Sequence, residues 1–346
     1  MDISKYKDKG YSGLMNLGNT CFINSTLQLL SHTYELNEFL DSEKHLNLDK
    51  RILDSEMMYE WDDLRQVLWR QNGKISPNKF IVNVFNIAKK KKRDVFTGFS
   101  QNDMPEFFLF MIDCLHNSIS RPIDVNITGK IENDIDSIAK KCYELLKTIY
   151  TKEYSEFMDL FYGIYISEIV SKDKKKVHSN KPEQYLILDL PIKGDKDETL
   201  YECFDNYINY ELLEGDNSWY NEKTKKKEEV NKRIIFWSFP KILVICLKRF
   251  SEDGSRKKLN KIDFPLRNLD LSKYVKGYNA NKYKYDLYGI CNHIGNVNGG
   301  HYTSYIKTAN GEWIHFNDDN LSKVVKSHLI TPLAYCLFYR QKNNII

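Results

Sequence analysis

Hydrophobic positions in the first half of the chain recur with the period of an α-helix. Ile23, Leu27 and Leu30 follow the i, i+4, i+7 spacing that places side chains on one helix face. The run from Phe107 to Leu115 is apolar on nearly every side, which is typical of a buried helix. Further helical patterns lie at 57–68, 80–87 and 121–160.

The pattern changes towards β-strands from Leu160 onwards. Short apolar runs predict strands at 160–166 and 185–190. The most apolar tract is interrupted by a turn at Pro240, and it predicts a pair of buried strands at 234–239 and 242–250. Because the turn interrupts it, this tract is too short to span a bilayer.

The dipeptide Asn310-Gly311 lies between two further β-type runs, which is the strongest short-range signal for a β-hairpin. This hairpin would bring His301 back towards Asn317 and Asp318. A histidine beside an amide or a carboxylate forms half of a nucleophilic cysteine site, in which the histidine is the base and its neighbour orients it. The alternative is a structural histidine.

The length of the turn decides which neighbour faces the histidine. A strict two-residue turn at Asn310-Gly311 would place Asp318 on the same sheet face as His301, with Asn317 on the opposite face. One additional loop residue or a bulge would reverse this assignment. The pattern alone leaves both alternatives open.

Cys21 occupies a position where a thiol can be reactive. Asn19 and Thr20 are favourable helix N-caps, so Cys21 should lie in the first turn of the helix that follows. Unpaired N–H groups and the positive end of the helix dipole stabilise a thiolate there, and the thiolate is the nucleophilic form of cysteine. The alternative is a buried structural cysteine.

A second helix start carries acidic residues. Asp103 is a suitable N-cap for the buried helix that includes 107–115, and Glu106 follows three residues later. Because this helix is buried, both carboxylates would emerge from the core at fixed positions, where they could bind a ligand. Simple helix capping is the alternative.

Composition and charge exclude several classes of protein. The chain has 346 residues, of which 42% are hydrophobic, enough for a sizeable core. The formal net charge of +4 is too small to indicate a nucleic-acid partner, and we interpret the lysine runs as solvated surface. The polar N-terminus cannot be the apolar region of a secretory signal. Seven cysteines without a C-x-x-C pair argue against a disulfide framework and a cysteine-based zinc site, and they favour the cytosol or nucleus.

Taken together, these stretches resemble the ubiquitin-specific protease family of deubiquitinases, from Gly13 to Tyr339. The family's cysteine, acidic and histidine boxes correspond, in the expected order, to 13–30, 101–107 and 299–318. Weaker matches lie between and after them, at 182–190, 240–250, 262–265 and 334–339. The resemblance implies an α+β, papain-like fold with a helical thumb, an antiparallel β palm and β fingers.

The resemblance also implies how the chain is divided. We expect an N-terminal arm at residues 1–12 and a single catalytic domain at 13–346. Within this domain the thumb would cover about 13–158, and the fingers and palm would cover about 159–346.

The implied reaction is hydrolysis of the isopeptide or peptide bond after the C-terminal glycine of ubiquitin. Cys21 would be the nucleophile, His301 the general base and acid, and Asn317 the residue that orients His301. Asn16 matches the family's oxyanion-hole amide, and Asp318 is kept as a supporting residue. The residues that match those binding the ubiquitin tail are Gln101, Asp103, Glu106, Gly299, Gly300 and Tyr302.

The implied partners are ubiquitin and ubiquitinated proteins, bound by a monomer without a cofactor, nucleic acid or membrane. Family members often bind zinc through two C-x-x-C pairs in the fingers. The matching regions here, after Ser167 and after Tyr220, contain lysines and glutamates, so we expect no metal and shorter or looser fingers. The abundant lysine, asparagine, isoleucine and tyrosine are typical of an AT-rich genome; for a viral protein the compartment would be the host cell's.

Three alternatives remain beside the deubiquitinase interpretation. The first is a catalytically inactive ubiquitin-binding module. The second is a papain-like peptidase for another ubiquitin-like modifier or for ordinary peptides. The third is a basic interaction protein that uses the lysine runs.

Overall fold

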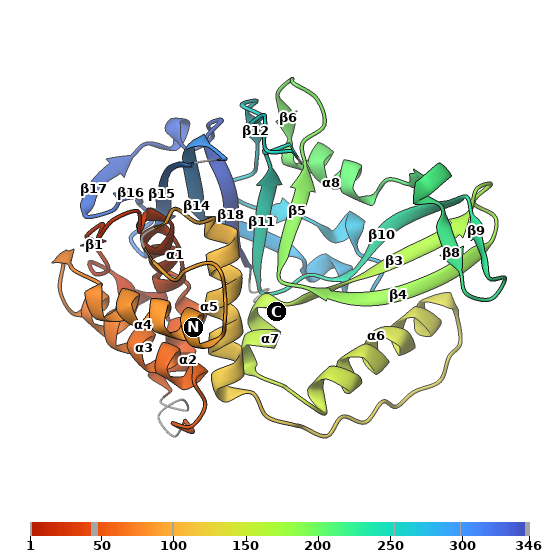
Figure 1. The fold of residues 1–346 in the computed structure, drawn as a ribbon, viewed down its shortest axis with the longest axis horizontal. Coiled ribbons are helices and arrows are strands. Elements are labelled where there is room, and N and C mark those ends of the chain that lie inside the picture. Colours follow the sequence, from red (N-terminus) through yellow and green to blue (C-terminus); the bar gives the residue numbers. More distant parts are fainter. Residues whose placement is uncertain (1, 43–47, 99, 252, 298, 343–346) are drawn as a thin grey trace.

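The computed structural model describes residues 2–42, 48–98, 100–251, 253–297 and 299–342. The N-terminal helices gather into one lobe, and strands from the second half of the chain form most of the remainder (Figure 1). The helices of this lobe are α1 Cys21–Ser31, α2 Tyr34–Asp41, α3 Asp54–Arg70, α4 Asn78–Lys90 and α5 Met104–Ile119. Helices α1, α3, α4 and α5 lie where the apolar periodicity predicted them, whereas α2 was not predicted as a separate helix.

A sheet of eight strands forms the centre of the molecule. Its order is β17-β16-β15-β14-β18-β11-β5, and β13 pairs with β14 off this path. All neighbours run antiparallel except β11 and β5, which are parallel. The strands are β5 Ile187–Pro191, β11 Ile242–Lys248, β13 Leu269–Asp270, β14 Lys284–Asn296, β15 Gly299–Lys307, β16 Trp313–Asn317, β17 Asn320–Val324 and β18 Ala334–Gln341.

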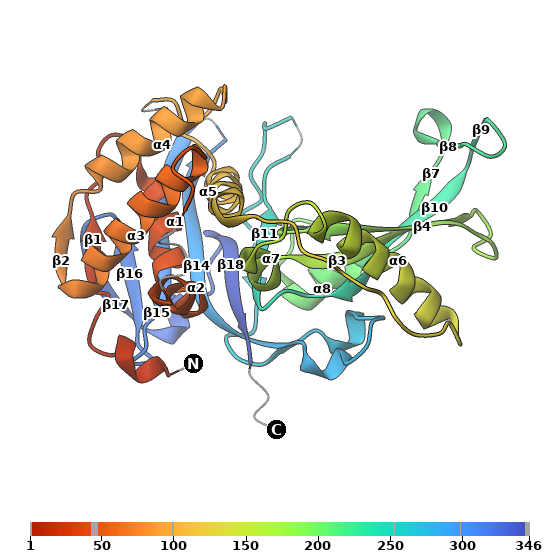
Figure 2. The same ribbon diagram turned by 90° about the horizontal axis from the view of Figure 1, so that it is seen from below.

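A second sheet, with the order β4-β3-β10-β7, projects away from this centre (Figure 2). Helix α6 (Asp134–Tyr150) lies along it, and Ala139 and Cys142 of α6 share a small core with Ile164 and Ile166 of β3. Helix α6 therefore packs on the projecting sheet, although it falls in the range predicted for the thumb. The strands are β3 Gly163–Ser171, β4 Val177–Tyr185, β7 Glu211–Leu213 and β10 Val230–Ser238, with the hairpin β8 Trp219–Asn221 and β9 Lys226–Glu228 at the far end.

The remaining described elements are short. They comprise α7 Glu156–Phe161, α8 Leu200–Ile208, the strand pairs β1 Ser12–Leu14 with β2 Gly73–Ile75 and β6 Glu198–Thr199 with β12 Ile262–Asp263, and single turns of 3-10 helix. Within the described residues, no helix has the length and apolar character that a membrane crossing requires.

Two strand predictions differ from the structure. The run at 160–166 begins as the end of α7, and β3 starts only at Gly163. The predicted pairing of 234–239 with 242–250 is wrong, because β10 pairs with β3 and β7, whereas β11 pairs with β18 and β5. The chain crosses from one sheet to the other at Pro240. Apolar composition identified both strands correctly, but it carries no information about their partners.

Helix α1 is buried between the central sheet and the other helices, and every one of its residues is buried. Phe22 packs edge-on against Phe107 of α5, with ring centroids 5.5 Å apart. On the sheet side, a Cβ on Gly289 would lie 2.4 Å from Leu29 Cδ2, so β14 approaches α1 closely only because it has a glycine there. This packing fixes the N-terminal end of α1, and Cys21 with it, beside β15.

The N-terminal residues contact both halves of this arrangement. Tyr6 stacks on Tyr34 of α2 with ring centroids 4.4 Å apart. Asp8 accepts a hydrogen bond from Asn310 Nδ2 at 2.7 Å, in the turn between β15 and β16. The arm therefore ties the helical lobe to the hairpin. Its boundary at residue 12 stays a prediction, as do the limits of thumb, palm and fingers.

The turn between β15 and β16 is longer than a strict two-residue turn. Lys307 pairs with Trp313, and the N–H of Thr308 donates to the carbonyl of Glu312 at 2.9 Å. Three residues, 309–311, therefore form the loop. This additional residue reverses the sheet face on which each following side chain lies.

Backbone conformation gives the same result. A two-residue type I′ turn requires positive φ at both central residues. Gly311 has φ +80°, but Asn310 is not among the residues with positive φ. The register places Asn317 on the same face as His301, and the strict-turn alternative, which favoured Asp318, is wrong.

We expect Gly311→Ala to lower the free energy of unfolding by about 1–2 kcal/mol, because an L-residue at this left-handed φ brings its Cβ close to the following carbonyl oxygen. Urea unfolding followed by circular dichroism measures the change. Gly73→Ala is the matched control, since a Cβ at Gly73 meets no atom within 4 Å. An equal loss in both variants would contradict this account of the turn.

Candidate active site

The segment before α1 folds into a tight turn that presents Cys21. Asn16 Oδ1 accepts hydrogen bonds from the N–H groups of Gly18 at 3.0 Å and Thr20 at 3.2 Å. Gly18 has φ +103°, a conformation that favours glycine. Thr20 is the N-cap residue and Cys21 the first residue of α1, as predicted, and Cys21 is only 4% exposed. The thiol therefore lies at the positive end of the α1 dipole.

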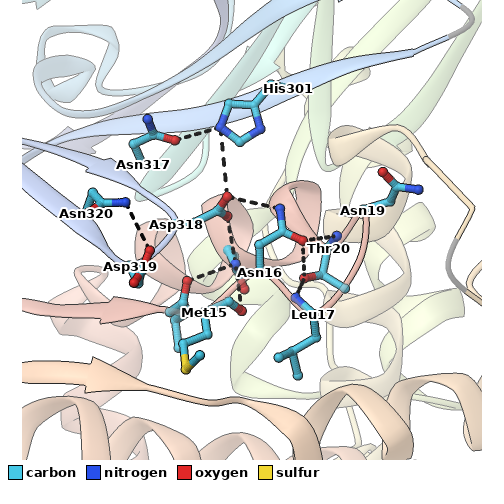
Figure 3. A network of polar contacts seen from close by, with 12 residues as sticks. Met15, Asn16, Leu17, Asn19, Thr20, His301, Asn317, Asp318, Asp319 and Asn320 are labelled. Carbon is cyan, nitrogen blue, oxygen red and sulfur yellow. Dashed lines mark hydrogen bonds and ion pairs between the residues drawn. The ribbon is translucent and has the colours of Figure 1, made fainter.

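His301 on β15 interacts with Cys21 on one side and Asn317 on the other. Its Nε2 lies 2.6 Å from Asn317 Oδ1 (Figure 3). The contact with the Cys21 thiol is the largest cause that raises the pKa of His301 to about 9; burial opposes the rise, and the Asn317 hydrogen bond adds to it. At neutral pH the imidazole therefore holds a positive charge beside the sulfur atom.

Asp318 lies next to His301 and Asn317, but its hydrogen bonds are with other residues. Its Oδ2 accepts a hydrogen bond from Asn16 Nδ2 at 3.0 Å and lies 3.9 Å from His301 Nε2. Its Oδ1 accepts from Asn24 Nδ2 at 2.8 Å, and its backbone carbonyl accepts from the N–H of Leu14 at 3.0 Å. Asp318 therefore joins the β16–β17 turn to the turn before Cys21 and fixes the amide of Asn16 (Figure 3).

The sequence analysis missed Asn24. This residue is buried in α1, and its Nδ2 also donates to the backbone carbonyls of Leu14 at 3.1 Å and Met15 at 3.3 Å. It holds the strand before Cys21 and the carboxylate of Asp318 at the same time. No distinct signal marked it in the sequence, because α1 also contains Ser25, Thr26 and Gln28; the partners that a buried polar group needs became visible only in the structure.

Close packing at Gly13 keeps the two ends of the chain together. A Cβ on Gly13 would lie 2.6 Å from Asp319 Cα, so the β16–β17 turn can approach β1 only at a glycine. Lys74 Nζ, on the neighbouring strand β2, pairs with Asp319 Oδ2 at 2.7 Å. Gly13 thus permits the contact through which Asp318 reaches Asn16.

A cavity of about 210 Å³ opens beside Cys21. The predicted tail-binding residues that line it are Gln101, Asp103, Gly299, Gly300 and Tyr302. Glu106 is not among the described lining residues and is exposed in the first turn of α5. The sequence analysis did not assign Phe250, His293 and Tyr335 to the site, although all three line the cavity. Phe250 and Tyr335 lie in the weaker family matches, whereas His293, within β14, lies in none of them.

Asp103 joins two walls of this cavity. It occupies the N-cap position of α5, but its side chain makes no capping hydrogen bond, so the simple capping alternative is wrong. Its carboxylate instead accepts hydrogen bonds from Tyr302 Oη at 2.7 Å and Tyr335 Oη at 3.3 Å. Burial raises the pKa of Asp103, and the two tyrosine hydrogen bonds oppose that rise.

Gln101 crosses the cavity mouth. Its Oε1 accepts a hydrogen bond from the N–H of Gly300 at 2.7 Å. A Cβ on Gly299 would lie 2.6 Å from the same oxygen, so side chains larger than glycine would displace Gln101 from this strand. The two glycines before His301 therefore keep the start of β15 open to close backbone approach.

Ionic and aromatic contacts hold the tip of the projecting sheet. Arg233 Nε lies 2.5 Å from Glu168 Oε1, and its guanidinium lies 4.7 Å from the ring centre of Tyr210. Lys174 Nζ lies 4.4 Å from the same ring centre.

The described residues contain no cluster of three histidine, cysteine or acidic side chains that could hold a metal ion. The expectation of no zinc stays a prediction.

Comparison with known proteins gives consistent matches. The family model described as ubiquitin carboxyl-terminal hydrolase matches residues 12–339. Ubiquitin carboxyl-terminal hydrolase 2 of Bos taurus is 34% identical over 342 residues, covering 96% of this chain and 55% of the relative. The Gallus gallus protein of the same name is 34% identical over 342 residues, covering 96% of this chain and 93% of the relative. The chain thus spans about half the length of the bovine relative.

Solved structures with the same fold include the SAGA DUB module containing Ubp8. The module bound to ubiquitin aldehyde matches with a TM-score of 0.74 and 27% identity, over 99% of this chain and 72% of that chain. The module bound to monoubiquitin matches with a TM-score of 0.72 and 27% identity, over 99% and 71%. These matches confirm the α+β fold expected from the resemblance.

We expect Cys21→Ala to lower the pKa of His301 from about 9 towards its ordinary value of 6.5, because the contact with sulfur is the largest cause of the rise. Because the pKa of His301 is raised on folding, its protonation contributes stability to the folded protein. This contribution is fully present below pH 6.5 and is lost as the pH rises through about 9. An NMR titration of the histidine ring protons measures the shift.

His32 serves as the internal control in this titration. Burial lowers its pKa to about 4, so its signals should not change between the two proteins. An unchanged His301 pKa in Cys21→Ala would contradict the assigned contact.

Proposed function

The chain belongs to the ubiquitin carboxyl-terminal hydrolase family, and we propose that it is a cysteine-dependent deubiquitinase that hydrolyses the bond after the C-terminal glycine of ubiquitin. The observation that carries this proposal is the position of His301, which contacts Cys21 and lies 2.6 Å from Asn317. The base is thus hydrogen-bonded to its orienting group and lies beside the nucleophile, which is the arrangement that nucleophilic catalysis needs.

Cys21 attacks the carbonyl carbon of the terminal glycine. The proton of the thiol already resides on His301, whose ring is positively charged at neutral pH, so the sulfur attacks as an anion and forms a tetrahedral intermediate with the substrate. Asn317 holds the imidazole through Nε2, so the other ring nitrogen is directed to the sulfur. The start of α1 adds a favourable dipole for the negative sulfur.

Asn16 and the backbone N–H of Cys21 stabilise the oxyanion of this intermediate. In the free protein one hydrogen of Asn16 Nδ2 is held by Asp318 Oδ2 at 3.0 Å, and the amide has a second hydrogen to donate. Asp318 is therefore a positioning residue that acts through Asn16, and it is not the residue that orients His301.

His301 then gives its proton to the leaving lysine amine, and the carbon–nitrogen bond breaks. A thioester between Cys21 and the glycine carboxyl remains. His301 next removes a proton from water, which attacks the thioester and returns the free thiol. The positive charge on His301 at neutral pH supplies the proton for the amine.

The cavity beside Cys21 suits a tail without side chains. Gly299 and Gly300 form one edge, with the amide of Gln101 across from them. An extended Gly-Gly end can lie along the glycine edge once Gln101 releases the Gly300 N–H, whereas larger residues would meet the cavity lining. Asp103 contributes to this channel mainly by holding Tyr302, since both of its oxygens already accept hydrogen bonds from tyrosines.

We also propose where and with what the protein acts. Its partners are ubiquitin and ubiquitinated proteins, and it acts as a monomer in the cytosol or nucleus, without nucleic acid or membrane. All seven cysteines are free thiols, which fits a reducing compartment. The Ubp8 structures with bound ubiquitin support ubiquitin as the partner.

Turnover of a fluorogenic substrate attached to the C-terminus of ubiquitin tests the proposal. We expect Cys21→Ala to abolish turnover and Asn16→Ala to lower kcat by about 10²–10³-fold, the usual cost of one oxyanion donor. Asn317→Ala should lower it by about 10²–10⁴-fold, because His301 loses its orientation. An active wild type excludes the inactive binding module, and competition with other modifiers ending in Gly-Gly identifies the preferred one.

Double variants separate the two neighbouring residues. Asp318→Ala should cost about as much as Asn16→Ala, and combining them should add little, since Asp318 acts through that amide. Asn317→Ala and Asn16→Ala affect different groups and should be close to additive. The assignment would be wrong if Asp318→Ala were as severe as Cys21→Ala while Asn317→Ala was mild.

The pH dependence of turnover should follow His301. Because the pKa of this residue is raised to about 9, kcat should fall as the pH rises through about 9, where the ring loses the proton that it gives to the leaving group. A pH–rate profile from 6 to 10 measures the fall. A profile that already declines near pH 6.5 would show that the contact with Cys21 does not set this protonation.

A further inference from the structure

The loop after β11 is fastened to the β14–β15 hairpin by one lysine. Lys257 Nζ lies 3.0 Å from His293 Nδ1, 2.7 Å from the carbonyl of His293 and 3.2 Å from the carbonyl of Gly295. A lysine ammonium has three hydrogens to donate and cannot accept, so these three acceptors satisfy it completely. A second contact joins the same segments, because a Cβ on Gly254 would lie 3.2 Å from Val297 Cγ1.

This contact determines the protonation of His293. Since Lys257 donates to Nδ1, the proton of the neutral imidazole must lie on Nε2. Burial is the main cause that lowers the pKa of His293 to about 4, and Lys257 and His301 lower it further. The ring is therefore neutral at physiological pH and has one N–H, at Nε2.

Nε2 of His293 faces the channel for the tail. His293 lines the cavity beside Cys21, and a Cβ on Gly300 would lie 2.4 Å from its Nε2. The ring packs against Tyr302 with centroids 4.6 Å apart and planes tilted by 33°, which restricts its orientation. The hydrogen bonds that His293 makes with other described residues through its ring use Nδ1, and none of them uses Nε2.

We propose that His293 donates a hydrogen bond from Nε2 to a backbone carbonyl of the Gly-Gly end of the substrate, and that Lys257 is the positioning residue that keeps this donor aimed. The inference rests on the proposed function and concerns the same site. It also gives Gly300 a role, because a Cβ there would lie 2.4 Å from Nε2 and would displace the ring that carries the donor. Recognition of the tail thus depends on a loop that carries no catalytic residue.

Binding to ubiquitin with and without its two terminal glycines tests the inference. All proteins carry Cys21→Ala, so that no hydrolysis occurs, and calorimetry measures both affinities. The parent should prefer intact ubiquitin. Lys257→Met and His293→Phe should each lose about tenfold of that preference, the value of one hydrogen bond, while affinity for the truncated form is unchanged. Lys261→Met, an exposed lysine on the same connection, is the matched control.

A spectroscopic measurement distinguishes positioning from general stability. Long-range proton–nitrogen NMR spectra should show the His293 ring protonated only at Nε2 in the parent and as a mixture of tautomers in Lys257→Met. The inference is overturned if Lys257→Met keeps the full preference for intact ubiquitin or the single tautomer. If the parent does not bind ubiquitin at all, the proposed function fails as well, so the two failures are distinguishable.

Discussion

The contact between the β16–β17 turn and the turn before α1 is the constraint on which the site depends. Asp318 and Asn16 are 302 positions apart in the chain, yet their side chains are hydrogen-bonded at 3.0 Å. Asn24, inside α1, bonds the same carboxylate, and Gly13 leaves the space that the turn needs. Buried polar groups are stable only when paired, so this network specifies one arrangement of the two chain ends. Everything that Cys21 and His301 do follows from that arrangement.

Asn317 and Asp318 contact different groups of the site because consecutive side chains of a strand point to opposite faces. Asn317 is the last residue of β16 and shares the face of His301, whereas Asp318 begins the turn with φ +52° and points towards α1. One residue therefore orients the base and the next one orients the oxyanion donor. Elsewhere in the cavity, Asp103 accepts a hydrogen bond from Tyr302, and Lys257 donates to the carbonyl of His293. Neither Asp103 nor Lys257 belongs to the central sheet.

Local patterns in the sequence predicted the helix that starts at Cys21, the hairpin that carries His301 and the strands at 234–250. They could not predict that β10 and β11 belong to different sheets, because partners of apolar strands depend on the whole fold. The choice between Asn317 and Asp318 depended on a single loop residue, and the family resemblance, rather than the turn signal, pointed to Asn317. Asn24, His293 and Lys257 carried no motif, and their roles arise only where distant segments meet.

The central claim is that Cys21 is a nucleophile directed at the end of ubiquitin. The most direct measurement is reaction of the folded protein with ubiquitin that carries a C-terminal propargylamide, followed by mass spectrometry of the peptide adduct. The account predicts one ubiquitin per chain, attached to Cys21 and absent when the protein carries Cys21→Ala. Attachment to another cysteine, or no adduct on a folded sample, would contradict it.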